Sequence, residues 1–95
     1  MSDTPDPDFR DNPAASRFEL NVEGHTAVII YEPMEGGLVF VHTVVPKALE
    51  GKGVGGRLVK AALAEMRARG QKVRPDCPFV RAWLERHPGY EDVTV

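Results

Sequence analysis

The sequence predicts an α/β (α+β) domain of about four mixed, mainly antiparallel strands and two helices, in the order βββαβα. Three observations predict it. Apolar and polar residues alternate early in the chain, two β-branched apolar runs follow, and the apolar spacing then changes to a helical period. The 95 residues are enough for one domain with a modest core.

The first two strands are predicted on either side of a tight turn. RFELNV (17–22) alternates apolar with polar side chains, which is typical of a half-buried strand. HTAVIIY (25–31) is apolar and rich in β-branched residues. Only Glu23-Gly24 separates them, so we expect an antiparallel pair.

The third strand is predicted at LVFVHTVV (38–45), after a hairpin loop at EPMEGG (32–37). The run is nearly all apolar, which predicts a central strand with both faces covered. Strand alternation would place His42 on one face with Leu38, Phe40 and Val44. Pro46 ends the strand because proline cannot donate to the ladder.

The first helix is predicted over residues 54–69, with Gly70 as a left-handed C-terminal cap. One apolar stripe at helical spacing supports this prediction. It consists of Val54, Leu58, Val59, Ala62, Leu63 and Met66.

A short fourth strand, QKVRP (71–75), and a second helix complete the predicted domain. Pro78 suits a first helical position, which makes Cys77 the expected N-cap, and Pro88-Gly89 end the helix. Residues 1–15 carry four aspartates and three prolines, so we expect a disordered acidic tail before a domain at 16–95.

Composition excludes several function classes. The formal net charge is −2, which gives no electrostatic footprint for nucleic acid, and no apolar run is long enough to span a bilayer. A single cysteine and three scattered histidines indicate neither a disulfide framework nor a metal site. We therefore expect a cytoplasmic protein.

Four glycines between residues 51 and 56 lead into the first predicted helix. Gly51, Gly53 and Gly56 fit a dinucleotide-binding motif, but five residues separate them from the preceding strand and too little chain follows for a doubly wound sheet. A glycine-rich turn that binds no ligand is an alternative interpretation. The favoured interpretation is a phosphate cradle, because bare helix N-terminal amides bind anions. Lys52 and Arg57 flank it.

The same segment, EGKGVGGRLVKAAL, resembles the acetyl-CoA motif of the GCN5-related N-acetyltransferases (GNAT superfamily), Gln/Arg-x-x-Gly-x-Gly/Ala, with Gly53 and Gly55 at its glycines. Glu50 stands at the Gln/Arg position, which departs from the pattern. HTVVP (42–46), KVRPDCPF (72–79) and RHPGY (86–90) resemble the short YjdJ-like, or N-acetyltransferase domain-containing-1-like, subgroup. The resemblance covers about residues 17–92 and implies a truncated form of that family's fold.

The resemblance implies that the backbone amides of residues 51–56, including Val54, bind the pyrophosphate of coenzyme A. It also implies that strand 38–45 splays from strand 72–75 around the pantetheine arm, with amides near Val44 and Val45 orienting the thioester. The family's two acceptor-binding helices have no counterpart at Glu23-Gly24. The acceptor site is then open, or completed by a partner.

Two residues are candidates for the chemistry. His42 has a side chain that titrates near neutrality and could act as a base, although a structural histidine is the alternative. Cys77, as an N-cap, would face helix amides that favour its thiolate and could accept the acetyl group; a buried inert cap is the alternative. The resemblance also implies a carboxylate at position 44, where this chain has Val44.

The sequence thus predicts a protein that binds acetyl-CoA as substrate and transfers its acetyl group to an unidentified amine, on a small molecule or a protein. A non-catalytic acyl-CoA-binding or interaction module is the alternative, and a structural domain without coenzyme is a third. Neither nucleic acid nor membrane is an expected partner.

Overall fold

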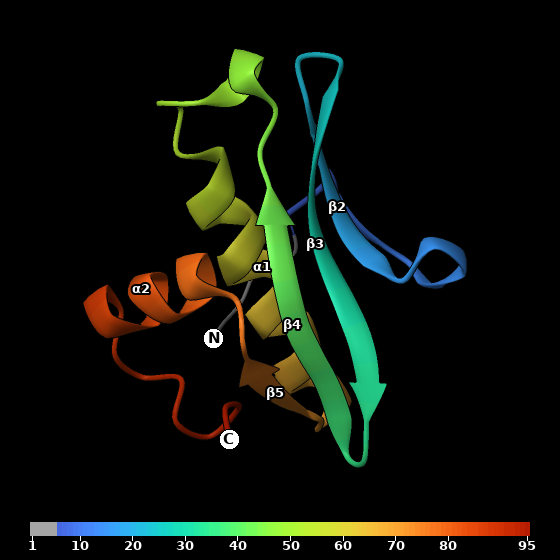
Figure 1. The fold of residues 1–95 in the computed structure, drawn as a ribbon, viewed down its shortest axis with the longest axis vertical. Helices are drawn as coiled ribbons and strands as arrows, with labels where there is room; N and C mark the ends of the chain where they lie inside the picture. The colour runs from blue at the N-terminus through green and yellow to red at the C-terminus, as the bar shows by residue number, and fades with distance from the viewer. Residues whose placement is uncertain (1–5) are drawn as a thin grey trace.

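The computed structural model describes residues 6–95. The chain forms one five-stranded sheet with two α-helices, and the sheet is twisted (Figure 1). The strands follow the order β1-β2-β3-β4-β5, and every neighbouring pair is antiparallel except the parallel pair β4–β5. The elements are β1 (Phe9–Asn12), η1 (Pro13–Ala15), β2 (Arg17–Val22), β3 (His25–Met34), β4 (Gly37–Val44), η2 (Lys47–Leu49), α1 (Val54–Arg69), β5 (Lys72–Pro75) and α2 (Pro78–Arg86).

The predicted fold class is confirmed. Helix α1 has the predicted bounds, and Gly70 caps it in the left-handed conformation at φ 68°. Cys77 and Pro78 take the N-cap and first positions of α2. The β3–β4 hairpin is tighter than predicted, because β3 extends to Met34 and Gly37 already belongs to β4. Within residues 6–95, neither helix has the length and apolar character needed to cross a membrane.

The fifth strand, β1, lies where the sequence predicts a disordered tail, and the structure contradicts that prediction for residues 9–15. Residues 1–5 lie outside the described part of the chain. Phe9–Asn12 pair with Arg17–Leu20 of β2 and extend the sheet by one edge. Composition is misleading here because the aspartates find partners on other elements.

Two aspartates attach this segment to α1. Asp11 accepts a hydrogen bond from the Tyr31 hydroxyl at 2.6 Å and another from the Arg69 guanidinium at 2.6 Å. Asp6 accepts from the Arg57 guanidinium at 2.9 to 3.2 Å. Burial, then the Asp11 hydrogen bond, raise the pKa of Tyr31 to about 12. The acidic residues thus fix the segment instead of solvating it.

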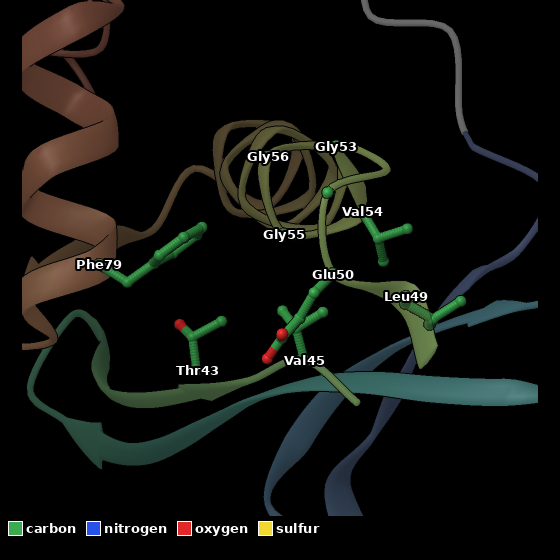
Figure 2. Close-up of a pocket in the computed structure, with 10 residues that line it drawn as sticks. Thr43, Val45, Leu49, Glu50, Gly53, Val54, Gly55, Gly56 and Phe79 are labelled. Carbon is green, nitrogen blue, oxygen red and sulfur yellow. The ribbon is translucent and has the colours of Figure 1, made fainter. Parts of the chain in front are cut away.

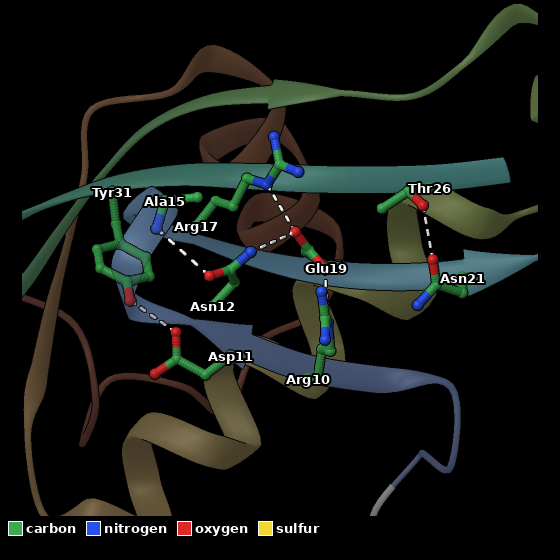
Figure 3. Close-up of polar contacts among 9 residues, drawn as sticks. All are labelled: Arg10, Asp11, Asn12, Ala15, Arg17, Glu19, Asn21, Thr26 and Tyr31. Atoms are coloured by element: carbon green, nitrogen blue, oxygen red, sulfur yellow. Dashed lines mark hydrogen bonds and ion pairs between the residues drawn. The ribbon is translucent and has the colours of Figure 1, made fainter.

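Glu19 is the one buried charged residue of the described chain, at 2% exposure, and it lies on the sheet face that the helices leave uncovered. Asn12, Arg10 and Arg17 all donate to its carboxylate, at 3.0, 2.7 and 2.7 Å (Figure 3). The hydrogen bonds from Asn12 and Arg17 are the largest causes that lower the pKa of Glu19 from 4.5 to about 2. This network joins β1 to β2.

The core lies between the helices and one sheet face only. Phe18, Leu20, Ile29 and Phe40 pack with apolar residues of both α1 and α2. The prediction that the third strand is covered on both faces is therefore wrong.

A β-bulge in β4 decides which residues reach the core. The register passes from Ile30↔His42 to Tyr31↔Phe40, so Val41 is the extra residue. Phe40 and Thr43 consequently share the helix-covered face with their partners Tyr31 and Ile29, whereas His42 lies on the open face. The predicted common face of Phe40 and His42 is wrong for this reason.

Glu19→Gln tests the buried network. The folded pKa lies below the unfolded one, so Glu19 stabilises the fold above about pH 4.5 and this contribution is lost as the pH falls toward 2. We expect the variant to lose about 3 kcal/mol at pH 7, with the difference from wild type vanishing near pH 2. Urea unfolding across this range measures it. Glu85→Gln, on the exposed face of α2, is the control, and a difference unchanged with pH would contradict the assignment.

Gly37→Ala tests the contact that starts the β4–β5 pair. A Cβ at Gly37 would lie 1.8 Å from the carbonyl oxygen of Lys72, which is backbone and cannot turn aside. We expect a loss of about 3 kcal/mol or more in the free energy of unfolding. Gly36→Ala is the matched control, since that position has φ 81° but open space, and should lose about 1–2 kcal/mol. Equal losses in urea unfolding would refute the steric argument.

Candidate functional site

A pocket of about 420 Å³ lies between the end of β4, the loop after it, and the first turns of α1 and α2 (Figure 2). Its walls are mostly apolar side chains and glycine backbone. It is lined by Thr43, Val45, Leu49, Glu50, Gly51, Gly53, Val54, Gly55, Gly56 and Phe79.

The pocket exists because β4 and β5 separate. Their pairing ends at Phe40↔Pro75, where the amides of Asp76 and Cys77 both donate to the Phe40 carbonyl, at 3.1 and 3.0 Å. The chain then turns into α2 while β4 continues to Val44 (Figure 1). Clefts beyond the carboxyl ends of parallel strands are common ligand sites.

The loop before α1 depends on two glycines with left-handed backbone. Gly51 has φ 78° and Gly53, the N-cap of α1, has φ 73°. The first helical hydrogen bond runs from the Arg57 amide to the Gly53 carbonyl at 3.1 Å. The amides of residues 54–56 therefore have no acceptor within the helix, and the helix dipole places partial positive charge there.

The two glycines inside α1, Gly55 and Gly56, have a packing explanation. A Cβ at Gly55 would lie 2.6 Å from the Phe79 ring, and one at Gly56 would lie 3.2 Å from the Trp83 indole nitrogen. The glycines thus admit two aromatic rings of α2 close to α1. The left-handed backbone of the first two glycines and the close packing at the other two account for all four glycines without a ligand. The argument for a bound ligand therefore rests on the pocket and on the free amides of residues 54–56.

The two predicted cations flank the loop but do not line the pocket. The Lys52 ammonium lies 2.7 Å from the Glu23 carboxylate in the β2–β3 turn. The Arg57 guanidinium contacts Asp6 at 2.9 Å, and this hydrogen bond raises its pKa. Both positive charges are therefore engaged by carboxylates outside the pocket.

Cys77 lies behind the pocket. It is 2% exposed, and its sulfur is 3.3 Å from the hydroxyl of Thr43, which does line the pocket. No hydrogen bond joins the thiol to the amides of α2, so the predicted N-cap interaction of the side chain is absent among residues 6–95.

The structure does not bring the two candidate catalytic residues together. His42 is exposed on the open sheet face, whereas Cys77 is buried on the helix side. Val44 shares the open face, is 44% exposed and does not line the pocket. The sheet, at strand β4, therefore separates His42 from Cys77.

The predicted cofactor-binding residues divide accordingly. Val45, Gly51, Gly53, Val54, Gly55 and Gly56 line the pocket, and Val44, Lys52 and Arg57 do not. Sequence reasoning missed Thr43, Leu49 and Phe79 as pocket residues, and it noted Glu50 only as a departure from a motif. The β-bulge could not be predicted from the sequence, so Thr43 was not expected on the pocket side, and Phe79 is 41% exposed at the pocket.

Comparison with known proteins agrees with this architecture. A family model described as GCN5-related N-acetyl-transferase matches residues 17–93, which include the sheet from β2 onward, both helices and the whole pocket. A search of curated proteins found no match. The chain belongs to the GCN5-related N-acetyltransferase family.

Proposed function

We propose that the pocket binds acetyl-CoA and that the protein transfers the acetyl group to an amine, as a member of the short YjdJ-like subgroup. The observation that carries the proposal is the placement of the helix amides of residues 54–56 at a pocket opened by two separating parallel strands. Helix N-termini bind phosphate oxygens, and an apolar cleft suits the uncharged pantetheine arm. The family match supports the same activity.

Each part of the ligand has a matching part of the pocket. The diphosphate would accept hydrogen bonds from the amides near Gly53–Gly56. Lys52 and Arg57 lie beside that loop, and phosphate would replace Glu23 and Asp6 as their partners. The pantetheine arm would lie along Val45, Leu49 and Phe79. The thioester would then approach Thr43 and the β4 backbone at Val44 and Val45, beyond the last residue that β5 pairs.

Cys77 and His42 would have different roles in acetyl transfer. The Cys77 thiol adjoins the pocket through Thr43, so it could receive the acetyl group when that hydroxyl turns away. His42 would act only on an amine that approaches from the open sheet face. The alternative function, a binding module without turnover, is favoured by the separation of these two residues and by the apolar side chain of Val44. A free thiol in the core suits the cytoplasm.

Acetyl-CoA turnover tests the proposal directly. The purified protein is titrated with coenzyme A by calorimetry and then incubated with acetyl-CoA and a panel of primary amines while free thiol is measured. We expect saturable binding and amine-dependent thiol release. Binding without release above the uncatalysed rate would favour the binding module, and absence of binding would refute the proposal.

The variant Cys77→Ser separates the two chemical routes in the same assay. If Cys77 accepts the acetyl group, the variant binds coenzyme A normally but releases no thiol, and wild type incubated without amine gains the mass of one acetyl group. Cys77→Ala is the control for packing, since the residue is buried. Full turnover in both variants would remove Cys77 from the mechanism.

A further inference from the structure

We propose that the indole N–H of Trp83 donates a hydrogen bond to the diphosphate of coenzyme A, beside the free amides at the start of α1. This inference rests on the proposed function and adds a side-chain donor to a site in which backbone amides are the proposed donors. It follows from a buried N–H group that has no acceptor in the described part of the chain.

Trp83 lies one helical turn after Phe79 in α2, so both rings lie on the face of α2 that is turned toward α1. Phe79 lines the pocket beside Gly55. The Trp83 indole nitrogen lies 3.2 Å from the position that a Cβ would have at Gly56, which also lines the pocket. The adjacent ring atom, Cδ1, is 3.7 Å from the same position. The N–H edge of the indole therefore faces the first turn of α1.

The indole nitrogen is an unused donor. Trp83 is 6% exposed, and within residues 6–95 no hydrogen bond engages its nitrogen. An indole nitrogen can donate but not accept, and in a buried tryptophan it usually has an acceptor. Every fully buried side-chain nitrogen or oxygen of these residues has a partner, so the Trp83 nitrogen must retain some access to solvent. A ligand oxygen can therefore reach it.

The two cations beside the loop differ from Trp83 in this respect. The Lys52 ammonium is paired with Glu23 at 2.7 Å. The Arg57 guanidinium is paired with Asp6 at 2.9 Å. Each cation must exchange a carboxylate for a phosphate when the ligand binds, whereas the indole N–H has no protein partner to lose. Because hydrogen bonds to charged acceptors are stronger than those between neutral groups, a phosphate oxygen is a favourable acceptor for this donor.

The ring that carries the donor is held in one orientation. It stacks on the His87 imidazole, with ring centroids 4.0 Å apart and planes inclined by 13°. The Tyr90 ring packs against it at a centroid distance of 5.4 Å. The His87 Nδ1 atom lies 2.8 Å from the Trp83 backbone carbonyl oxygen, which fixes the imidazole in turn. A donor that is already oriented loses little conformational entropy when a ligand binds.

The single tryptophan of the chain makes the test direct, because isotope-labelled protein gives one indole N–H signal. Titration with coenzyme A should move this signal downfield, with the same half-saturation concentration as the amide signals of Gly53 and Gly55. An indole signal that stays unchanged while those amides shift would overturn the inference and leave the proposed function intact. If neither the indole nor the amides shift at saturating coenzyme A, the inference and the proposed function both fail.

The variant Trp83→Phe removes the N–H and keeps an aromatic ring. We expect the dissociation constant for coenzyme A, measured by calorimetry, to rise about tenfold, which is the loss typical of one hydrogen bond to a charged group. Tyr90→Phe removes a hydroxyl from the same aromatic cluster, outside the pocket lining, and is the matched control that should bind as wild type does. An unchanged dissociation constant in Trp83→Phe would count against the hydrogen bond.

Phosphorus NMR distinguishes a direct contact from an effect of packing. At saturating coenzyme A, the diphosphate signals of the bound ligand should differ between wild type and Trp83→Phe, whereas the signal of the ribose phosphate should be the same in both. Identical diphosphate signals in the two complexes would assign the weaker binding to altered packing, and the inference would then be wrong.

Discussion

The separation of β4 from β5 is the constraint on which the site depends. The two strands pair only from Gly37 to Phe40, and the Phe40 carbonyl then accepts two amides from the turn into α2. With that acceptor used, β4 continues without a parallel neighbour. Its free side, the loop after Val45 and the start of α1 enclose the pocket. Without the separation, the helix amides would face a closed sheet.

The close approach of α2 to α1 both packs the two helices together and shapes the opening of the pocket. Gly55 and Gly56 let the rings of Phe79 and Trp83 lie against α1, and Phe79 then forms one side of the opening. The charged groups near the loop are also separated into those outside the pocket and those in its lining. Lys52 and Arg57, which flank the loop, are each held by a carboxylate outside the pocket, and Glu50 supplies the charge in the pocket lining.

Local sequence patterns predicted much of the fold. The bounds of α1, the Gly70 cap and the Cys77-Pro78 start of α2 follow from periodicity and capping chemistry, which depend on neighbours along the chain. The bulge at Val41 and the strand β1 depend on partners far away in sequence, such as Ile30 and Glu19, and no local signal reveals them. For the site, the glycine loop could be predicted from the sequence. The position of Thr43 on the helix-covered face depends on the bulge, so the sequence did not predict it.

The proposed function requires that the free amides at the start of α1 bind the diphosphate of coenzyme A. Titration of the isotope-labelled protein with coenzyme A, followed by amide chemical shifts, tests this most directly. We expect the amide signals of Gly53, Val54, Gly55 and Gly56 to shift first and most. Those of Gly24 and Gly89, which lie outside the pocket lining, should stay unchanged. Saturating coenzyme A that leaves those four amides unperturbed would contradict it.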